Sequence, residues 1–280
     1  MHDDAPAPFL KWAGGKRQLL PRILDLAPAR IETYYEPFVG GGAVFFALAA
    51  GKRFGRAVLG DANPELVNCY ESVRDDVAGV IAELRKHRNT KADYYKVRAK
   101  DPSRLSKTAR AARVIYLNRC GYNGLYRVNS DGRFNVPFGS YARPNICDVP
   151  RLEAAARALA EVDLVCGDFR DVLAERQPGE NDFVYLDPPY VPISRTASFT
   201  AYAQRAFGPD DQRRLAETLR ALSREQVPAL LSNSYCSDTR RLYAGPDLIY
   251  KKVPARRAIN SVGAGRGLVD EILVRTVAIR

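Results

Sequence analysis

Apolar runs that end in glycine or acid turns predict an α/β sheet in the first part of the chain. A strand over residues 33–38 is followed by a glycine turn at residues 40–42 and a helix over residues 43–50. A second strand over residues 57–60 ends on Asp61. Strand, glycine loop, helix, strand and acid form the mononucleotide-binding half of a doubly wound fold.

The same pattern resumes in the second half of the chain. It predicts strands over residues 163–166 and 182–186, and a helix over residues 209–223 with leucines on one face. A strand in "VPALLSNS" and a final pair of strands, "DLIYKKV" and "EILVRTVAI", follow. Together they predict a mixed sheet of about seven strands.

The segment between these two halves has a different pattern. From Pro64 to about Cys147 it contains two stretches typical of basic amphipathic helices, "YESVRDDVAGVIAELRKHR" and "SKTARAARVIYLNRC". Residues 125–128 and 133–136 then read as hairpin arms around an Asp-Gly turn. An α/β fold does not require this segment, so we interpret it as an insertion.

Composition narrows the classes of function. The chain has 43 Lys and Arg against 32 Asp and Glu, and this surplus of +11 favours a polyanionic partner, with nucleic acid ahead of an acidic membrane surface. Two histidines are too few for histidine triads and most zinc chemistry. The five cysteines form no CxxC pair, so we expect reduced core thiols and no metal. No apolar run is long enough for a bilayer, and a soluble intracellular protein is expected.

The glycine loop indicates the kind of ligand. Asp61 lies about twenty residues after Gly40, where an acid accepts hydrogen bonds from ribose hydroxyls. Counted from Gly40, the third glycine of GxGxxG is Phe45, and Gly41 widens the turn. A nucleoside without phosphates, such as S-adenosylmethionine, therefore fits better than a pyrophosphate. The alternative is an ordinary strand-to-helix turn.

The stretch "DFVYLDPPYVP" carries the candidate chemistry. Asp187 follows an apolar strand, at the edge where ligands of such sheets bind. Pro188 and Pro189 fix two successive φ angles, so the carboxylate, the Pro188 carbonyl and the Tyr190 ring keep a nearly fixed relation. The two acceptors suit the hydrogens of a conjugated amine, and Tyr190 suits stacking on an extruded base, worth about 1–3 kcal/mol. The alternative is a stiff turn at the end of a strand.

Eight segments in one order resemble the Dam-like DNA adenine methyltransferases over nearly the whole chain. They are "FLKWAGGKRQLLPRI", "YYEPFVGGGAVFFAL", "GDANPELVN", "YNGLYRVNSDGRFNVPFGSY", "GDF", "YLDPPYVPISRTASFTAY", "LLSNS" and "RRAINSVGAGRGLVDEIL". The resemblance implies a Rossmann-like S-adenosylmethionine-dependent methyltransferase sheet over residues 1–63 and 148–280. It also implies an inserted, mostly helical DNA target-recognition domain over residues 64–147, which carries the β-hairpin.

The resemblance implies a site for the methyl donor. Trp12 and Lys16 would contact S-adenosylmethionine, Asp61 would hold its ribose, and Asp187 would lie beside the transferable methyl group. The glycine turn before Lys16 is compatible with a cation that meets the donor carboxylate, the alternative being a solvated lysine. The expected donor-binding residues are Trp12, Lys16, Phe38, Gly40, Gly42, Asp61, Asp168, Phe169 and Asp187. The expected catalytic residues are Asp187, Pro188 and Tyr190.

The resemblance also implies contacts with double-stranded DNA. Lys11 corresponds to a guanine-contacting lysine, and Arg127 on the hairpin would bind guanine in a bidentate way, discriminating by about 1–3 kcal/mol. These identities are similar to those of members that read GATC, although Ser140 stands where a basic residue is common. Tyr122 and Asn123 are expected near the extruded base, with local hairpin packing as the alternative. The expected DNA-binding residues are Lys11, Tyr122, Asn123, Leu125, Arg127, Pro137 and Tyr141.

Two further segments are expected at the DNA. "VPISRTASFTAY" is hydroxyl-rich and is interpreted as a loop that orders on DNA. Arg256 and Arg257 are interpreted as phosphate contacts, with a solvated surface pair as the alternative. We expect a monomer on DNA in the cytoplasm, associated with the nucleoid and encoded by a bacterium or a phage.

Other functions remain open from the sequence. The same fold acts on the cytosine 4-amino group, on RNA or on a protein amide, and those family members usually carry serine or asparagine in place of Asp187. Phe45 argues against a nicotinamide oxidoreductase. No Asp or Glu is followed two positions on by Lys, which argues against one common kind of metal nuclease, and the intact DPPY argues against a non-catalytic DNA-binding module. A restriction-modification role and a replication-marking role both remain open.

Overall fold

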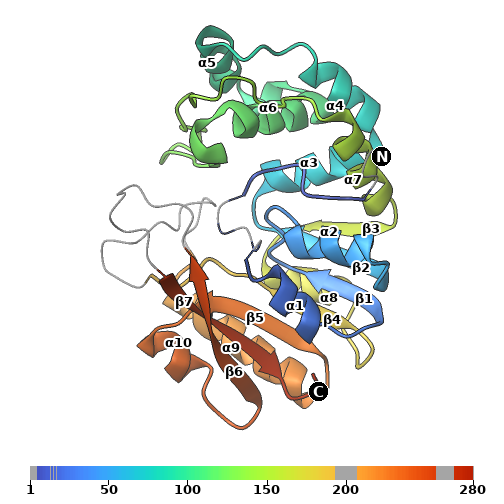
Figure 1. Ribbon diagram of the computed structural model, residues 1–280, viewed down its shortest axis with the longest axis vertical. Helices are drawn as coiled ribbons and strands as arrows, with labels where there is room; N and C mark the ends of the chain where they lie inside the picture. Colours follow the sequence, from blue (N-terminus) through green and yellow to red (C-terminus); the bar gives the residue numbers. More distant parts are fainter. Residues whose placement is uncertain are drawn as a thin grey trace.

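A seven-stranded sheet forms the centre of the computed structural model, which describes residues 5–12, 14, 16, 18–192, 207–256 and 268–279 (Figure 1). The strand order is β3-β2-β1-β4-β5-β7-β6. The strands are β1 (Ile31–Glu36), β2 (Phe54–Asp61), β3 (Val162–Cys166), β4 (Phe183–Leu186), β5 (Ala229–Ser234), β6 (Leu248–Arg256) and β7 (Leu268–Thr276).

The sheet is mostly parallel, as a doubly wound fold requires. β1 pairs in parallel with β2 and β4, and the parallel pairing continues to β3 on one side and β5 on the other. Only β7 runs against its two neighbours, β5 and β6. The mixed α/β prediction is therefore confirmed, and the two main errors in bounds are that β1 ends at Glu36 and not at residue 38, and that β2 begins at Phe54 and not at residue 57.

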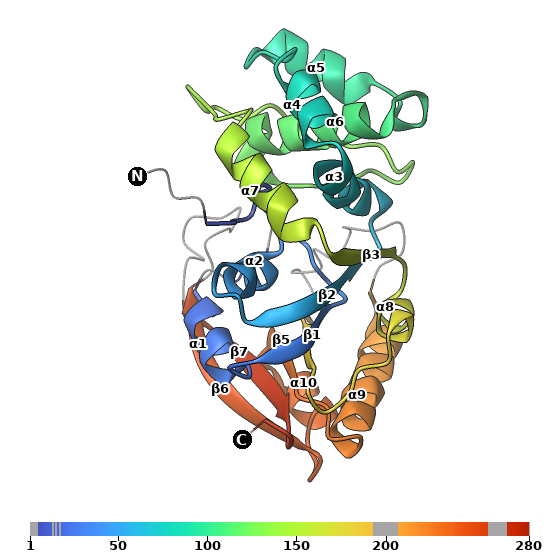
Figure 2. The ribbon, with the colours of Figure 1, turned by 90° about the vertical axis from the view of Figure 1, so that its right-hand side faces the viewer.

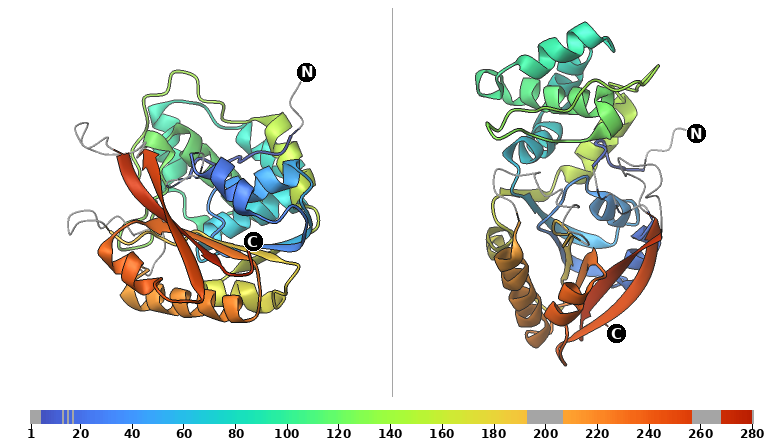
Figure 3. Two further views of the ribbon diagram at one scale, coloured as in Figure 1. Left: turned by 60° about the horizontal axis from the view of Figure 1, so that its bottom comes forward. Right: turned by 90° about the vertical axis from the view of Figure 1, so that its left-hand side faces the viewer.

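Helices cover both faces of the sheet (Figures 2 and 3). α1 (Leu20–Leu26) and α2 (Ala43–Ala50) lie on one face, where Phe45 and Phe46 are fully buried. α8 (Phe169–Glu175), α9 (Pro209–Arg224) and α10 (Ser237–Leu242) lie on the other. The predicted leucine face of α9 is confirmed, because Leu215, Leu219 and Leu222 join the buried cluster on this side of the sheet.

The middle of the chain forms a helical layer beyond the end of the sheet that carries β3 (Figure 1). One predicted helix is wrong, because the first basic stretch is divided at Asp76, which has a φ of −150° and caps the second helix by accepting from Gly79 N at 2.9 Å. The layer consists of α3 (Pro64–Asp75), α4 (Val77–Leu84), α5 (Lys91–Ala99), α6 (Lys107–Cys120) and α7 (Val149–Leu159).

This layer shares one buried core with the sheet. Leu66 of α3 and Ile115 of α6 belong to the same apolar cluster as Tyr34 of β1 and Leu59 of β2. Packing of this kind fixes the layer rigidly relative to the carboxyl ends of the strands. The boundaries of a separate domain at residues 64 and 147 remain a prediction.

The predicted hairpin is present as a short turn and not as two regular strands. A single antiparallel bridge joins Val128 and Phe134, flanked by hydrogen bonds from Asn129 N to the Arg133 carbonyl and from Asn135 N to the Arg127 carbonyl. The side chain of Asn129 closes the turn by accepting from the amide of Arg133 at 2.9 Å. The two hairpin arms, which follow α6 in the chain, are therefore joined by few backbone hydrogen bonds.

The cysteines are all free thiols, but they are not all core residues. Cys69 and Cys120 are buried as expected, whereas Cys166 is exposed at the end of β3. In the part of the chain that the structure describes, no helix is both long and apolar enough to cross a membrane.

Candidate active site

The candidate site lies where β1 and β4 are neighbours and the strand order reverses. At such a point the loops after two adjacent parallel strands diverge and leave room for a ligand at their carboxyl ends. The glycine loop follows β1, Asp61 ends β2 and Asp187 follows β4 directly. The topology therefore brings together the chemistry-bearing residues that the sequence separates by more than a hundred positions.

Asp187 is held through both of its carboxylate oxygens. Lys16 Nζ lies 2.7 Å from Oδ2, and Ser232 Oγ donates to Oδ1 at 3.0 Å. Lys16 is only 7% exposed and also donates to the Gly14 carbonyl, whereas the Asp187 side chain remains 21% exposed. Burial raises the pKa of Asp187, while Lys16 and Ser232 oppose this rise. The carboxylate is thus fixed, partly desolvated and still open to a ligand.

The Tyr190 ring stands beside this carboxylate. Its hydroxyl donates to Glu271 Oε2 at 2.7 Å, and Lys16 Nζ lies 4.7 Å from its ring centroid. Pro188, between the acid and the ring, is buried. The structure thus brings Asp187, Pro188 and Tyr190 into one corner, with Lys16 in contact with both the acid and the ring.

The glycine loop is packed against the indole of Trp12. Gly40 has a φ of +48°, and a Cβ there would lie 2.8 Å from Trp12 Cδ1. Gly42 has a φ of +69°, and a Cβ there would lie 2.7 Å from the Tyr70 hydroxyl. This hydroxyl donates to the Gly40 carbonyl at 3.1 Å. Trp12 stacks on Tyr126 of the hairpin on its other side. The loop therefore needs its glycines to admit side chains of the protein itself.

Asp61 links the ends of β1 and β2. Its carboxylate accepts from Gly40 N at 3.2 Å and from Asn63 N at 3.0 Å. Burial raises the pKa of Asp61 to about 6, against the effect of these backbone donors. A carboxylate has four acceptor positions, so two backbone bonds leave room for a diol.

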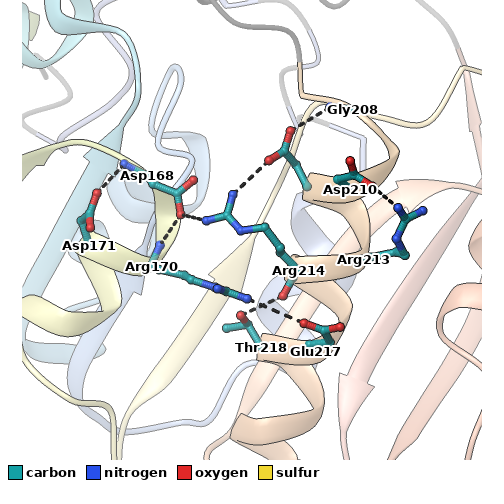
Figure 4. Close-up of polar contacts among 10 residues, drawn as sticks. Asp168, Arg170, Asp171, Gly208, Asp210, Arg213, Arg214, Glu217 and Thr218 are labelled. Carbon is teal, nitrogen blue, oxygen red and sulfur yellow. Dashed lines mark hydrogen bonds and ion pairs between the residues drawn. The ribbon is translucent and has the colours of Figure 1, made fainter.

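Phe169 and Phe38 form an aromatic wall beyond Asp61. Their rings stack with centroids 5.6 Å apart, and Phe207 meets Phe38 edge-on. The guanidinium of Arg214 on α9 lies over the Phe169 ring. It also donates to Asp168 Oδ1 at 2.8 Å, a contact drawn in Figure 4. Asp168 also caps α8, so this acid is already bound on one oxygen.

These residues suit an adenosyl sulfonium donor that carries an amino-acid tail. The flat aromatic wall suits an adenine, and the acid beside the glycine loop suits a ribose diol. The buried cation suits the carboxylate of the amino-acid tail, and the acid next to it suits the positive sulfonium. Of the nine predicted donor-binding residues, the structure places all at the carboxyl ends of the strands or in the N-terminal segment against them.

Several residues of the site were not predicted from the sequence. Glu36 is 3% exposed, accepts from Tyr34 OH and Phe45 N, and burial raises its pKa to about 8. Ser232 and Asn233 are fully buried on β5. A signal for these two was present, because "LLSNS" puts three polar residues into a strand that the pattern predicts to be buried.

Lys11 lies between the N-terminal segment and the helical layer. Its backbone exchanges two hydrogen bonds with the Asn118 side chain, at 2.8 and 2.6 Å, and its Nζ lies 4.3 Å from the ring centroid of Tyr141. Gly124, at φ +63°, gives the lysine stem room, because a Cβ there would lie 2.7 Å from Lys11 Cδ. The structure therefore brings Lys11 and Tyr141 together.

Of the other predicted DNA-binding residues, Leu125 and Arg127 lie on the hairpin, Tyr122 and Asn123 lie in the 3₁₀ turn before it, and Pro137 follows it. Arg127 Nε donates to Asn135 Oδ1 at 2.7 Å and a terminal nitrogen donates to the Asn135 carbonyl at 3.4 Å, so the guanidinium is held against the opposite arm. Tyr122 is 51% exposed, and the adjacent Asn123 has a φ of +53°. Pro137 is exposed and Leu125 is half-buried. The segment at residues 193–206 and Arg257 lie outside the described residues, as does the side chain of Arg256.

Known proteins similar to this chain decide the family. The family of D12 class N6 adenine-specific DNA methyltransferases matches residues 12–259. The chain belongs to this family. It is 41% identical to the type II methyltransferase M1.LlaDCHI of Lactococcus lactis subsp. cremoris, over 95% of this chain and 94% of that protein. It is 43% identical to the type II methyltransferase M.MjaIII of Methanocaldococcus jannaschii, over 92% and 94%. It is 38% identical to the DNA adenine methylase of Escherichia coli K12, over 95% and 93%.

Membership confirms the reading of the chain as an adenine-specific DNA methyltransferase that uses S-adenosylmethionine. The nicotinamide oxidoreductase, the nuclease and the non-catalytic DNA-binding module are thereby excluded.

Proposed function

We propose that this protein transfers the methyl group of S-adenosylmethionine to the 6-amino group of an adenine that is extruded from double-stranded DNA, within GATC. The observation that carries the proposal is the Asp187 corner. A fixed, partly exposed carboxylate and a proline carbonyl stand beside an aromatic ring at the point where the sheet opens to ligands. The family of adenine-specific DNA methyltransferases and the similarity to DNA adenine methylases support adenine in DNA as the substrate.

The corner would act on the amine by accepting its hydrogens. Asp187 and the Pro188 carbonyl would bind the two N–H groups and so draw the nitrogen lone pair out of conjugation and toward the methyl group. Tyr190 would stack on the base and offset part of the few kcal/mol needed to extrude it. The donor supplies the activated methyl group, so the protein mainly contributes position and orientation.

Lys16 would exchange partners when the donor binds. In the structure it neutralises Asp187 at 2.7 Å. A donor carboxylate would draw this cation away and leave Asp187 free for the amine. Trp12, Phe38, Gly40, Gly42, Asp61, Asp168 and Phe169 would hold the remainder of the donor.

Recognition of the target would come from the hairpin and the N-terminal segment. Arg127, whose guanidinium is held on Asn135, would present its remaining N–H groups to a guanine edge, and Lys11, an exposed residue, is held against Tyr141. Leu125, Pro137 and Tyr141 would contact the neighbouring bases, and Tyr122 and Asn123 would enter the space near the extruded adenine. The target-recognition unit would be residues 64–147, acting as a monomer on DNA in the cytoplasm.

One experiment tests the base, the sequence context and the catalytic residue together. Duplex DNA treated with wild-type protein and donor is digested to nucleosides, and a second portion is sequenced with modified bases identified in context. We expect N6-methyladenine in GATC, none with Asp187→Ala, and wild-type turnover with Asp238→Asn, which changes an aspartate that is 72% exposed on α10. N4-methylcytosine as the product, or undiminished turnover by Asp187→Ala, would refute the proposal.

A further inference from the structure

Three buried polar residues outside the predicted site hydrogen-bond to the segment that carries the proposed catalytic residues. Ser232 and Asn233 are both 0% exposed at the end of β5, and Gln212 on α9 is 6% exposed. Fully buried hydroxyl and amide groups cost free energy unless they are hydrogen-bonded. Their partners show what these groups do.

Asn233 and Gln212 form a closed chain of hydrogen bonds around Tyr190. Gln212 Nε2 donates to the Pro189 carbonyl at 2.8 Å, and Asn233 Oδ1 accepts from Val191 N at 3.0 Å. The two amides are joined by Asn233 Nδ2, which donates to Gln212 Oε1 at 3.1 Å. A backbone acceptor at one end and a backbone donor at the other fix the orientation of both amides.

The two prolines explain why side-chain amides hold this segment. Pro188 and Pro189 have no N–H, so the chain directly after Asp187 cannot be held by the usual backbone donors. The first groups available on either side of Tyr190 are the Pro189 carbonyl and the Val191 amide. These are the two groups that the amides bind, so the Tyr190 peptide is fixed at both ends.

Ser232 holds the acid from the other face of β5. Its hydroxyl donates its single proton to Asp187 Oδ1, so the 2.8 Å contact with Tyr185 must be a bond in which the tyrosine hydroxyl donates. The buried chain Tyr185, Ser232, Asp187 thus fixes Oδ1. Oδ2, which faces Lys16, is left as the oxygen for a ligand.

We propose that Ser232, Asn233 and Gln212 are positioning residues for methyl transfer, with Ser232 orienting the Asp187 carboxylate and the two amides fixing the main chain on both sides of Tyr190. This inference rests on the proposed roles of Asp187 and Tyr190. It assigns function to the polar end of a core strand and to α9, a helix outside the motif that carries the reaction.

The test separates chemistry from binding in single-turnover reactions with saturating donor. Gln212→Glu and Asn233→Asp keep size but replace a donor nitrogen by oxygen, and each is expected to slow methyl transfer about 10- to 100-fold. Donor affinity and DNA affinity are expected to stay within about twofold of wild type, since no donor-site or hairpin residue changes. With 2-aminopurine at the target adenine, the extruded base should be more fluorescent, because a displaced Tyr190 quenches it less.

Ser232→Ala gives a second, milder test with a different readout. The Ser232 hydrogen bond lowers the pKa of Asp187, so its loss is expected to move the acid limb of the rate profile to higher pH. Among the described residues, the titratable groups that interact with Asp187 are Lys16, Tyr34, Glu36, Tyr185 and Tyr190, and all are unchanged in this variant. Gln212→Glu and Asn233→Asp each add a carboxyl beside the corner, and a like charge there also raises the pKa of Asp187, so the acid limb is compared only between Ser232→Ala and wild type.

Ser234→Ala is the matched control, because its buried hydroxyl lies on the same strand without a hydrogen-bond partner in the described structure. Wild-type rates in Ser232→Ala together with an unmoved acid limb would overturn the role of Ser232. A fall in donor affinity parallel to the rate in the amide variants would show a merely structural role. If the wild-type protein does not methylate adenine, the proposed function is refuted. If it does and these variants react at the wild-type rate, only the positioning role of Ser232, Asn233 and Gln212 is refuted.

Discussion

Replacing Gly40 with alanine tests how the glycine loop and Trp12 form the donor site. Gly40 has a φ of +48°, where an L-residue costs about 1–2 kcal/mol. The new Cβ would lie 2.8 Å from Trp12 Cδ1. Carbon atoms in ordinary contact are about 3.5–4.0 Å apart, so the indole must move by roughly 0.7–1.2 Å. We therefore expect donor affinity to fall about 10- to 100-fold.

The chain itself provides the assay. Trp12 is the only tryptophan, so its fluorescence reports on this site alone. Titration with S-adenosylmethionine gives the dissociation constant, and emission without the donor shows whether the indole has moved. We expect the Gly40→Ala protein to emit at a different wavelength from wild type and to need more donor for half-saturation, while kcat at saturating donor changes little.

Gly51→Ala is the control, because Gly51 ends α2 at a φ of −82° and its Cβ would meet only Arg53 side-chain and Ala47 backbone atoms, at 3.4 Å or more. Wild-type donor affinity with unchanged emission in Gly40→Ala would refute the reasoning, because the loop could then hold the donor without the Trp12 contact.

Three further predictions concern buried charge, the cation and the hairpin. The pKa of Glu36 is about 8 in the folded protein against an ordinary value of 4.5, so folding takes up a proton between these values and stability falls as pH rises through that window. In urea unfolding, the free energy of unfolding of Glu36→Gln should exceed that of wild type by an amount on the order of a few kcal/mol at pH 9 and by little at pH 4. An equal difference at the two pH values would contradict this. Lys16→Met removes the cation 2.7 Å from Asp187, so donor binding should weaken and the acid limb of the pH–rate profile should move to higher pH. An unmoved acid limb would show that Lys16 does not lower the pKa of Asp187. Arg127→Lys should reduce discrimination at one base pair by about 1–3 kcal/mol in competition assays with single-substituted duplexes, whereas a uniform loss over all duplexes would indicate a phosphate contact.

The sequence predicted those parts of the fold that local pattern determines. α2 begins and ends where the pattern places it, because a glycine turn precedes an unbroken apolar run and Gly51 ends it. The end of β2 at Asp61 and the start of α9 at Pro209 are also correct. Asp76 shows the limit, since one side chain that caps a following helix divides what periodicity joins into a single helix.

The candidate site was predictable only in part, for a physical reason. Asp187 and Asp61 stand at strand ends, and the sheet rule brings such positions together without knowledge of side-chain contacts. Ser232, Asn233 and Gln212 act through contacts across β4, β5 and α9, and no spacing along the chain encodes those. The packing of Trp12 into the space left by Gly40 is likewise a tertiary contact, which a glycine motif read as a ligand cradle does not reveal.

The most direct test of the central claim is a crystal structure of the protein with a donor analogue and a GATC duplex. We predict an extruded adenine whose amino group lies between the Asp187 carboxylate and the Pro188 carbonyl, with Tyr190 on its ring and the donor sulfur in line with the nitrogen. A structure in which Asp187 still pairs with Lys16 and faces away from the sulfur, while the adenine binds elsewhere, would contradict the account.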